Sequence, residues 1–154
     1  MSTEENKALV RRLLERVRDG WSPAVIEEFF APSYRRHLNP TTAPLTREGQ
    51  RERANGLRAA FPDATVTLED IFAEGDRVAY RLTIRGTQQG AFQGIPPTGK
   101  QVTVSFTAIV RTEDGRVVEE WGGLDLFDLR RQLEAVVTGP DSKHAQASDA
   151  EQRV

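Results

Sequence analysis

The chain lacks cysteine altogether and contains only two histidines. Without cysteine it has no disulfides, thiol nucleophiles or cysteine-ligated zinc, and a secreted scaffold held by disulfides is excluded. One of the histidines, His144, lies near the C-terminus, which leaves His37 as the one histidine in the predicted domain. A single histidine does not build an ordinary histidine-rich metal site, so we expect neither a metal nor a metal-based cofactor.

An excess of charge of one sign is also missing, because 21 Lys and Arg stand against 23 Asp and Glu, a net charge of -2. This balance argues against nucleic acid as the main partner. No stretch approaches the roughly 20 apolar residues of a membrane span, and the first ten residues lack the basic and then apolar run of a signal peptide. We therefore expect a cytoplasmic protein without a membrane or nucleic-acid partner.

What the chain does contain fits one globular domain of 154 residues, 38% of them apolar. The first part is helical in pattern. Leu9, Leu13 and Val17 recur every four residues, and Ser2 with Glu5 forms a capping box. The pattern predicts helices from Ser2 to Asp19 with Gly20 ending the first, from Ser22 to before Pro32, and from Thr46 to Phe61, with a short extended segment over 34–38.

From Val66 onward the apolar period changes to two, which predicts strands. Turns at 74–76 and 113–115 separate alternating segments, the longest at 102–110 and the last at 117–125, and a final helix covers 127–136. Helices followed by antiparallel strands are typical of an α+β domain. We assign this domain to residues 1–137. The segment 138–154 has no large apolar residue before Val154 and is predicted to be a disordered tail.

The last predicted strand carries the residues most suited to chemistry. By strand alternation Glu119, Trp121, Gly123 and Asp125 share one face, and Glu120 lies on the other. A carboxylate beside tryptophan in a dry cavity has a raised pKa, which suits a general acid or base. The structural alternative is that Asp125 caps the final helix and Glu119 faces solvent.

Several segments together resemble the SnoaL-like polyketide cyclase family over roughly residues 5–135. They are Phe61-Pro62-Asp63, Glu74-Gly75-Asp76-Arg77-Val78, Arg81-x-Thr83-x-x-Gly86-Thr87, Gly90-x-Phe92-x-Gly94 with Ile95 to Lys100, and Gly115-Arg116 with Glu119, Trp121 and Asp125. The resemblance implies the NTF2-like fold, a cone-shaped α+β barrel in which three N-terminal helices pack on a strongly curved antiparallel sheet and close a pocket. It also implies a small-molecule substrate and a homodimer formed through the outer sheet face.

The chemistry that the resemblance implies is ring closure in aromatic polyketide biosynthesis by intramolecular aldol condensation, without metal or cofactor. The aspartate that matches Asp125 acts as acid and base. A proton between two carbonyls is already acidic, so one positioned carboxylate can remove it while the pocket holds the chain in a reactive conformation. The family commonly has histidine where this chain has Gln88. Glutamine can donate a hydrogen bond to an enolate oxygen but does not shuttle a proton.

The remaining site predictions complete this scheme. His37 compensates for the missing histidine, Arg81 stabilises an enolate, and the pocket wall and substrate contacts come from Trp121, Tyr80, Phe92 and Glu119. The structural alternatives are a hydrogen-bonded bridge for His37 and an ion pair with Glu119 for Arg81. The predicted function is a cofactor-independent cyclase or isomerase. The alternatives are a cofactor-free hydroxylase, an epoxide hydrolase or cyclase using Glu119 and Asp125, and a non-catalytic ligand-binding or dimerisation module.

Overall fold

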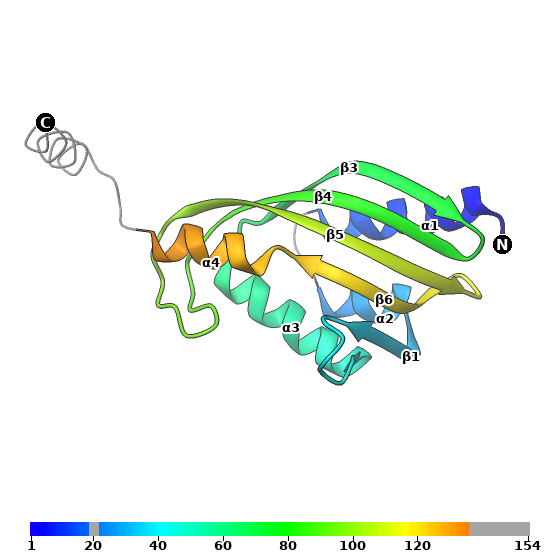
Figure 1. Ribbon diagram of the computed structural model, residues 1–154, viewed down its shortest axis with the longest axis horizontal. Helices are drawn as coiled ribbons and strands as arrows, with labels where there is room; N and C mark the ends of the chain where they lie inside the picture. The colour runs from blue at the N-terminus through cyan, green and yellow to red at the C-terminus, as the bar shows by residue number, and fades with distance from the viewer. Residues whose placement is uncertain (19–21, 136–154) are drawn as a thin grey trace, which may run out of the picture.

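The structure, a computed structural model, describes residues 1–18 and 22–135. Three helices lie against one face of a six-stranded sheet and a fourth packs at one end of it (Figure 1). The predicted α+β fold class is confirmed. The predicted boundary at residue 137, the tail 138–154 and the helix end at Gly20 lie outside the described residues. No helix in the described ranges is long and apolar enough to cross a membrane.

The three N-terminal helices begin where the sequence predicts. They are α1 (Thr3–Val17), α2 (Pro23–Phe29) and α3 (Arg47–Ala60). The hydroxyls of Ser2, Ser22 and Thr46 each accept a backbone N–H of the first turn. Such caps contribute about 1 kcal/mol each, because they satisfy donors that have no partner within the helix. The segment after α2 turns into a strand at once, earlier than the extended segment predicted from residue 34.

The sheet has the order β2-β1-β6-β5-β4-β3. Its strands are β1 (Phe30–His37), β2 (Leu45–Thr46), β3 (Thr65–Glu74), β4 (Arg77–Thr87), β5 (Gln101–Glu113) and β6 (Arg116–Leu124). Strands β3 to β6 are antiparallel neighbours, as predicted. Strand β1 runs parallel to β6, so the sheet is mixed. The predicted antiparallel arrangement holds for the other neighbouring strands and not for this pair. Apolar periodicity within one strand does not report the direction of its neighbour.

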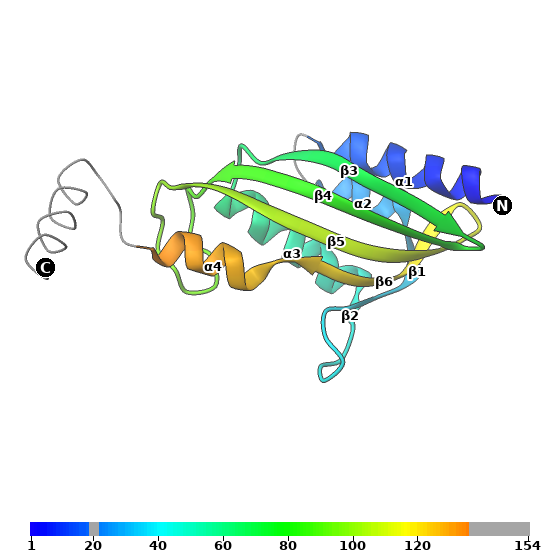
Figure 2. The ribbon, with the colours of Figure 1, turned by 45° about the horizontal axis from the view of Figure 1, so that its top comes forward.

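Two apolar clusters on the helix-facing side hold the elements together. The larger cluster joins α1 and α2 to the sheet, with Leu13, Ile26 and Val110 fully or almost fully buried. The smaller one joins the end of α3, the loop 88–100 and α4 (Leu126–Glu134), and includes Phe61 and Leu133. Figure 2 shows the end of α3 and α4 at the same end of the sheet. The two clusters meet at Ile84 and Leu124, which pack against both.

Candidate functional site

A cavity of about 410 Å³ opens where the two apolar clusters meet. Its walls come from α3, the inner face of the sheet and α4, and they are made of Leu57, Phe61, Val66, Ile84, Val104, Leu124 and Leu129 among others. The volume lies in the range of small-molecule pockets, and a lining dominated by aliphatic and aromatic side chains favours an apolar ligand. The alternation of β4 and β5 places these side chains, because Ile84 and Val104 are paired on the inner face.

The polar side chains of this cavity come from one helix. Asn55 and Arg58 line it from α3, and both are exposed, so they lie at its mouth. Among the described residues that line the cavity there is no aspartate, glutamate or histidine. The cavity thus offers a hydrogen-bonding amide and a guanidinium at the mouth, and apolar surface inside.

A buried polar cluster occupies the neighbouring part of the interior. Glu120 of β6 is 2% exposed and accepts hydrogen bonds from the hydroxyls of Tyr34 and Tyr80, the latter at 3.3 Å. Burial raises the pKa of both tyrosines and the Glu120 charge raises it further. Both phenols therefore keep their protons at neutral pH, and each hydroxyl donates a hydrogen bond to the carboxylate.

Arg36 is the cationic member of this cluster and is also 2% exposed. It donates to Gln50 Oε1 at 3.0 Å and to the Gly122 carbonyl at 3.3 Å. Burial lowers the pKa of Arg36, but Glu120 and the two phenols outweigh this effect and its pKa is raised. A Cβ on Gly123, whose φ is +152°, would lie 2.6 Å from the guanidinium, so glycine is needed there to admit Arg36.

One layer of side chains separates this cluster from the cavity. Along β4 and β5 the pair Tyr80–Ala108 belongs to the cluster, the pair Ile84–Val104 lines the cavity, and Leu82–Phe106 lies between them. The Phe106 ring stacks on Tyr80 with 6.0 Å between centroids, and the Arg36 guanidinium lies 5.4 Å from the Phe106 centroid. The cluster therefore braces the wall of the cavity and does not line it.

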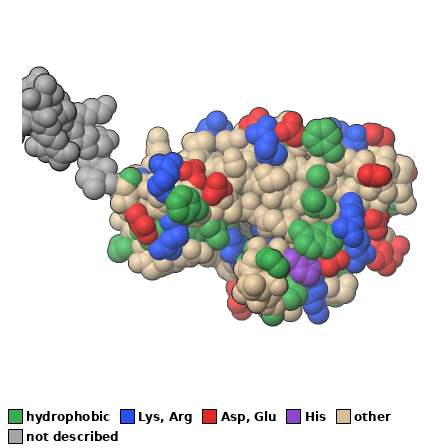
Figure 3. Space-filling view, viewed as in Figure 1, with side chains coloured by type: hydrophobic (Ala, Val, Ile, Leu, Met, Phe, Trp, Pro, Cys, Tyr) green, Lys and Arg blue, Asp and Glu red, His purple; other side chains and the backbone are tan. Residues whose placement is uncertain are grey.

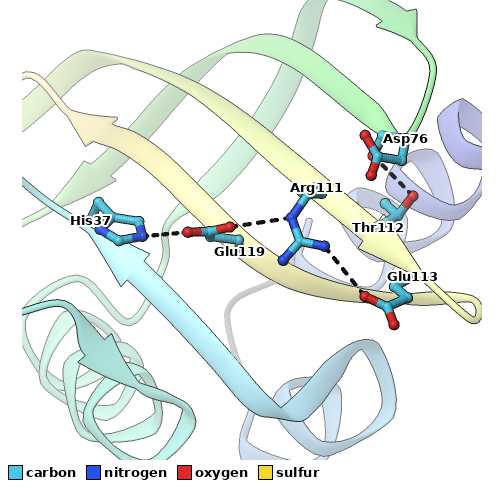
Figure 4. A network of polar contacts seen from close by, with 6 residues as sticks. All are labelled: His37, Asp76, Arg111, Thr112, Glu113 and Glu119. Carbon is cyan, nitrogen blue, oxygen red and sulfur yellow. Dashed lines mark hydrogen bonds and ion pairs between the residues drawn. The ribbon is translucent and has the colours of Figure 1, made fainter.

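His37, Glu119 and Trp121 lie together on the opposite, outer face of the sheet. His37 Nε2 lies 2.8 Å from Glu119 Oε2, and Arg111 Nε donates to the other oxygen at 3.2 Å (Figure 4). Burial raises the pKa of Glu119, but the hydrogen bonds from His37 and Arg111 outweigh it and the pKa is lowered. The Trp121 ring lies between the His37 ring, 5.3 Å away, and the Arg77 guanidinium, 4.8 Å away.

Asp125 sits at the junction of β6 and α4. Its carboxylate accepts the backbone N–H of Asp128 at 3.0 Å and so caps α4, while the side chain stays exposed. This is the capping arrangement that the sequence offers as the structural alternative. Asp125 directly follows Leu124, which lines the cavity, but does not line it itself. Within the described residues Glu119 and Asp125 share no hydrogen-bond partner, because Glu119 binds His37 and Arg111 and Asp125 caps α4.

The other predicted site residues also have structural partners. Gln88 is completely buried and holds the loop 88–100 together through the Ile95 carbonyl and Thr98. Arg81 forms its ion pair with Asp70 at 2.7 Å and not with Glu119. Phe92 packs against Phe61 in the smaller cluster, and Tyr80 belongs to the Glu120 cluster. Among the described residues none of the eight predicted site residues lines the cavity, and their catalytic and binding roles stay predictions.

The residues that sequence reasoning missed are Tyr34, Arg36, Asn55, Glu120 and Arg58. The one available signal was that one of the two faces of the last strand had to meet the helices and carry a carboxylate inward. Strand alternation placed Glu120 opposite Glu119 and Trp121, and the structure puts that face inside. Arg36 and Tyr34 carry no such signal, because the segment around them reads as a polar stretch. No three His, Asp or Glu side chains gather as a metal site within the described residues.

The model of the SnoaL-like polyketide cyclase family matches residues 8–133. The chain belongs to this family. Solved structures are also similar to this chain. One is AclR of Streptomyces galilaeus, a proposed hydroxylase, which is 28% identical with a TM-score of 0.78. The match covers 98% of this chain and 95% of AclR. IdmH of Streptomyces antibioticus, a proposed polyketide cyclase, is 32% identical over 84% of this chain and 99% of its own, with a TM-score of 0.72.

A proposed SnoaL-like polyketide cyclase from Jannaschia sp. CCS1 has the same TM-score as AclR, 0.78, at 28% identity, covering 88% of this chain and 95% of that chain. No curated protein matches the chain. The resemblance expected from the sequence motifs is thereby confirmed, and so is the NTF2-like architecture, here as an open sheet with a parallel β1–β6 pair. As a member of the SnoaL-like family the chain is expected to act on, or bind, a small molecule.

Proposed function

We propose that this SnoaL-like protein binds a hydrophobic, carbonyl-rich small molecule in the cavity beside α3 and promotes an enolate reaction, either intramolecular aldol ring closure or isomerisation. The observation that supports this is the apolar cavity of about 410 Å³ inside a SnoaL-like fold. Such a cavity excludes water and holds a flexible chain in one reactive conformation, which is where most of the rate gain of an intramolecular reaction arises.

The proposed acid and base is Asp125, next to Leu124 on the cavity wall. Its carboxylate takes the proton that lies between two carbonyls, the resulting enolate attacks a second carbonyl of the same molecule, and Asp125 returns the proton to the new alkoxide. No cofactor enters this scheme. Arg58 and Asn55 are the cavity's own hydrogen-bond donors for a polar group of the bound molecule.

The test is mass spectrometry of products from a panel of polyketide-type β-keto esters, with and without a further free carboxylate, and with and without oxygen. Asp125→Asn removes the proton acceptor but keeps a side chain that caps a helix equally well, so folding is preserved. Asp128→Asn, one turn further along α4, is the matched control. A product of unchanged mass that is lost in Asp125→Asn and kept in Asp128→Asn supports the proposal. An Asp125→Asn variant as active as the wild type refutes it.

A second candidate function is ligand binding without turnover. It is favoured by the exposed, capping position of Asp125 and by a cavity lining without a carboxylate or imidazole among the described residues. Ligand binding that is saturable, with no product from any member of the panel and identical behaviour of Asp125→Asn, would favour it. A cofactor-free hydroxylase is the third, supported by the likeness to AclR, and it predicts a product heavier by one oxygen that forms only in air.

We also propose that the protein is a homodimer through the outer face of the sheet. A row of side chains crosses that face in register, through the pairs Phe72–Ala79, Ala79–Ile109, Ile109–Trp121 and Trp121–His37. Figure 3 shows hydrophobic side chains running across this face towards the histidine. Phe72 is 68% exposed and Ile109 42%, more than a solvated strand face ordinarily leaves bare. Analytical ultracentrifugation tests this. The wild type is expected to sediment as a dimer and the Ile109→Lys variant as a monomer.

A further inference from the structure

The mouth of the cavity carries one positive charge. Arg58 is the one ionisable side chain among the described residues that line it, and Asn55 is its neighbour one helical turn away. Residues three apart on a helix lie on the same face, so both side chains reach the same part of the rim. The remaining lining, from Val17 to Leu129, is almost wholly apolar.

Within the described residues, Arg58 has no ion pair or hydrogen bond to another side chain. Arg51, on the same helix, differs in this respect, because it binds Glu48 and Glu27. Asp63, the acidic residue that follows the helix, accepts hydrogen bonds from the backbone N–H and the hydroxyl of Thr87, each at 2.7 Å. Both of its carboxylate oxygens are therefore already used. The guanidinium at the cavity mouth is therefore left to water or to a ligand.

A guanidinium presents two parallel N–H donors, which match the two oxygens of a carboxylate. An ester or amide at the same place accepts fewer hydrogen bonds and carries no charge. Hydrogen bonds between a guanidinium and a carboxylate are about twice as strong as the neutral hydrogen bonds that an ester or amide would make at the same place. A ligand that matches the whole site has an apolar body and one carboxylate end.

We propose that the ligand of this cavity is an amphipathic organic acid, bound with its apolar body inside and its carboxylate at Arg58 and Asn55. This rests on the proposed function, because it uses the same cavity, and it narrows the substrate class from carbonyl-rich molecules in general to those with a free acid. Arg58 is then the residue that determines selectivity for the acid over the ester.

The test is isothermal titration calorimetry with 1-naphthaleneacetate and its neutral amide, which have nearly the same shape. The wild type is expected to bind the acid about tenfold more tightly than the amide at low ionic strength. Arg58→Gln is expected to bring this ratio close to one without changing amide affinity, and Arg58→Lys to keep part of it. Arg85→Gln is the matched control, because Arg85 is exposed on the outer face of the sheet.

Equal affinities for acid and amide in the wild type, or an Arg58→Gln variant that keeps the preference, would overturn the proposal. So would the absence of binding of either compound. A folded Leu57→Trp variant, which fills the cavity from α3, should lose both ligands, and retention of both would show that they bind elsewhere and overturn it too. The measurement needs no turnover, so a failure of catalysis at Asp125 leaves its outcome unaffected.

Discussion

Raising the pH above the ordinary pKa of tyrosine should unfold this protein, because its only two tyrosines are both buried against one carboxylate. Tyr34 and Tyr80 have pKa values raised above 10.0 by burial and then by the charge of Glu120. In the unfolded chain both phenols titrate near pH 10. The unfolded state therefore loses protons that the folded state keeps, and the stabilisation, complete below pH 10, is lost as pH rises above it.

The size of the effect follows from proton linkage. Each phenol that stays protonated in the folded state lowers the free energy of unfolding by about 1.4 kcal/mol for every pH unit above its unfolded pKa. Two phenols together give about 2.7 kcal/mol per pH unit. Over two pH units this is about 5 kcal/mol, which is comparable to the whole stability of many domains of this size.

The assay follows tyrosinate absorbance and far-ultraviolet circular dichroism together during an alkaline titration. Tyrosinate should appear only as the helical signal disappears, in a single transition well above pH 10. Tyr80→Phe should halve both the tyrosinate amplitude and the pH dependence of stability, because one buried phenol remains. Tyrosinate that appears with a midpoint near pH 10 while the circular dichroism is unchanged would refute the buried Glu120 cluster.

Four further predictions concern stability and local order. Gly56→Ala should raise the free energy of unfolding by about 0.5–1 kcal/mol, since nothing lies within 4 Å of a Cβ there. Gly90→Ala should lower it by about 1–3 kcal/mol, because that Cβ would meet the Ala59 carbonyl oxygen at 2.5 Å. Denaturant titration measures both, and a stabilised Gly90→Ala would contradict the packing. Gln88→Ala should speed amide hydrogen exchange across the loop 88–100, whereas unchanged exchange would show that the buried amide does not hold the loop. Asp125→Ala should cost about 1 kcal/mol in thermal or denaturant unfolding and Asp125→Asn almost nothing, and equal losses would argue against the cap.

Much of the fold was readable from the sequence. The starts of three helices were predicted from the capping residues Ser2, Ser22 and Thr46. The change of the apolar period from four to two predicted where the helices end and the strands begin. These signals are local, since a cap or an alternation depends on a few neighbouring residues. The family motifs added the architecture. The parallel pairing of β1 with β6 was not readable, because strand direction depends on where the chain enters the sheet.

The site was harder to predict, and β6 shows why. Its pairing with β5 shifts register between Arg111 and Thr112, so that Val117 and Glu120 both face inward although they are three residues apart. A bulge of this kind shifts which side chains face inward, so strict alternation assigns the residues beyond it to the wrong face. Alternation also does not say which face of a strand meets the helices, and the face with Glu119 and Trp121, the more promising one in sequence, lies outside.

The sequence by itself thus determined the elements, their order and the family, because capping, periodicity and motif spacing are properties of short segments. Only the tertiary structure decided which charged groups are buried. Nothing in the sequence around Arg36 and Glu120 predicts that they are buried. They belong to one buried polar cluster because β1, β4, β6 and α3 meet there. Arg58 becomes the cation at the mouth of the cavity for the same reason: a functional site joins residues distant in sequence, and only packing brings them together.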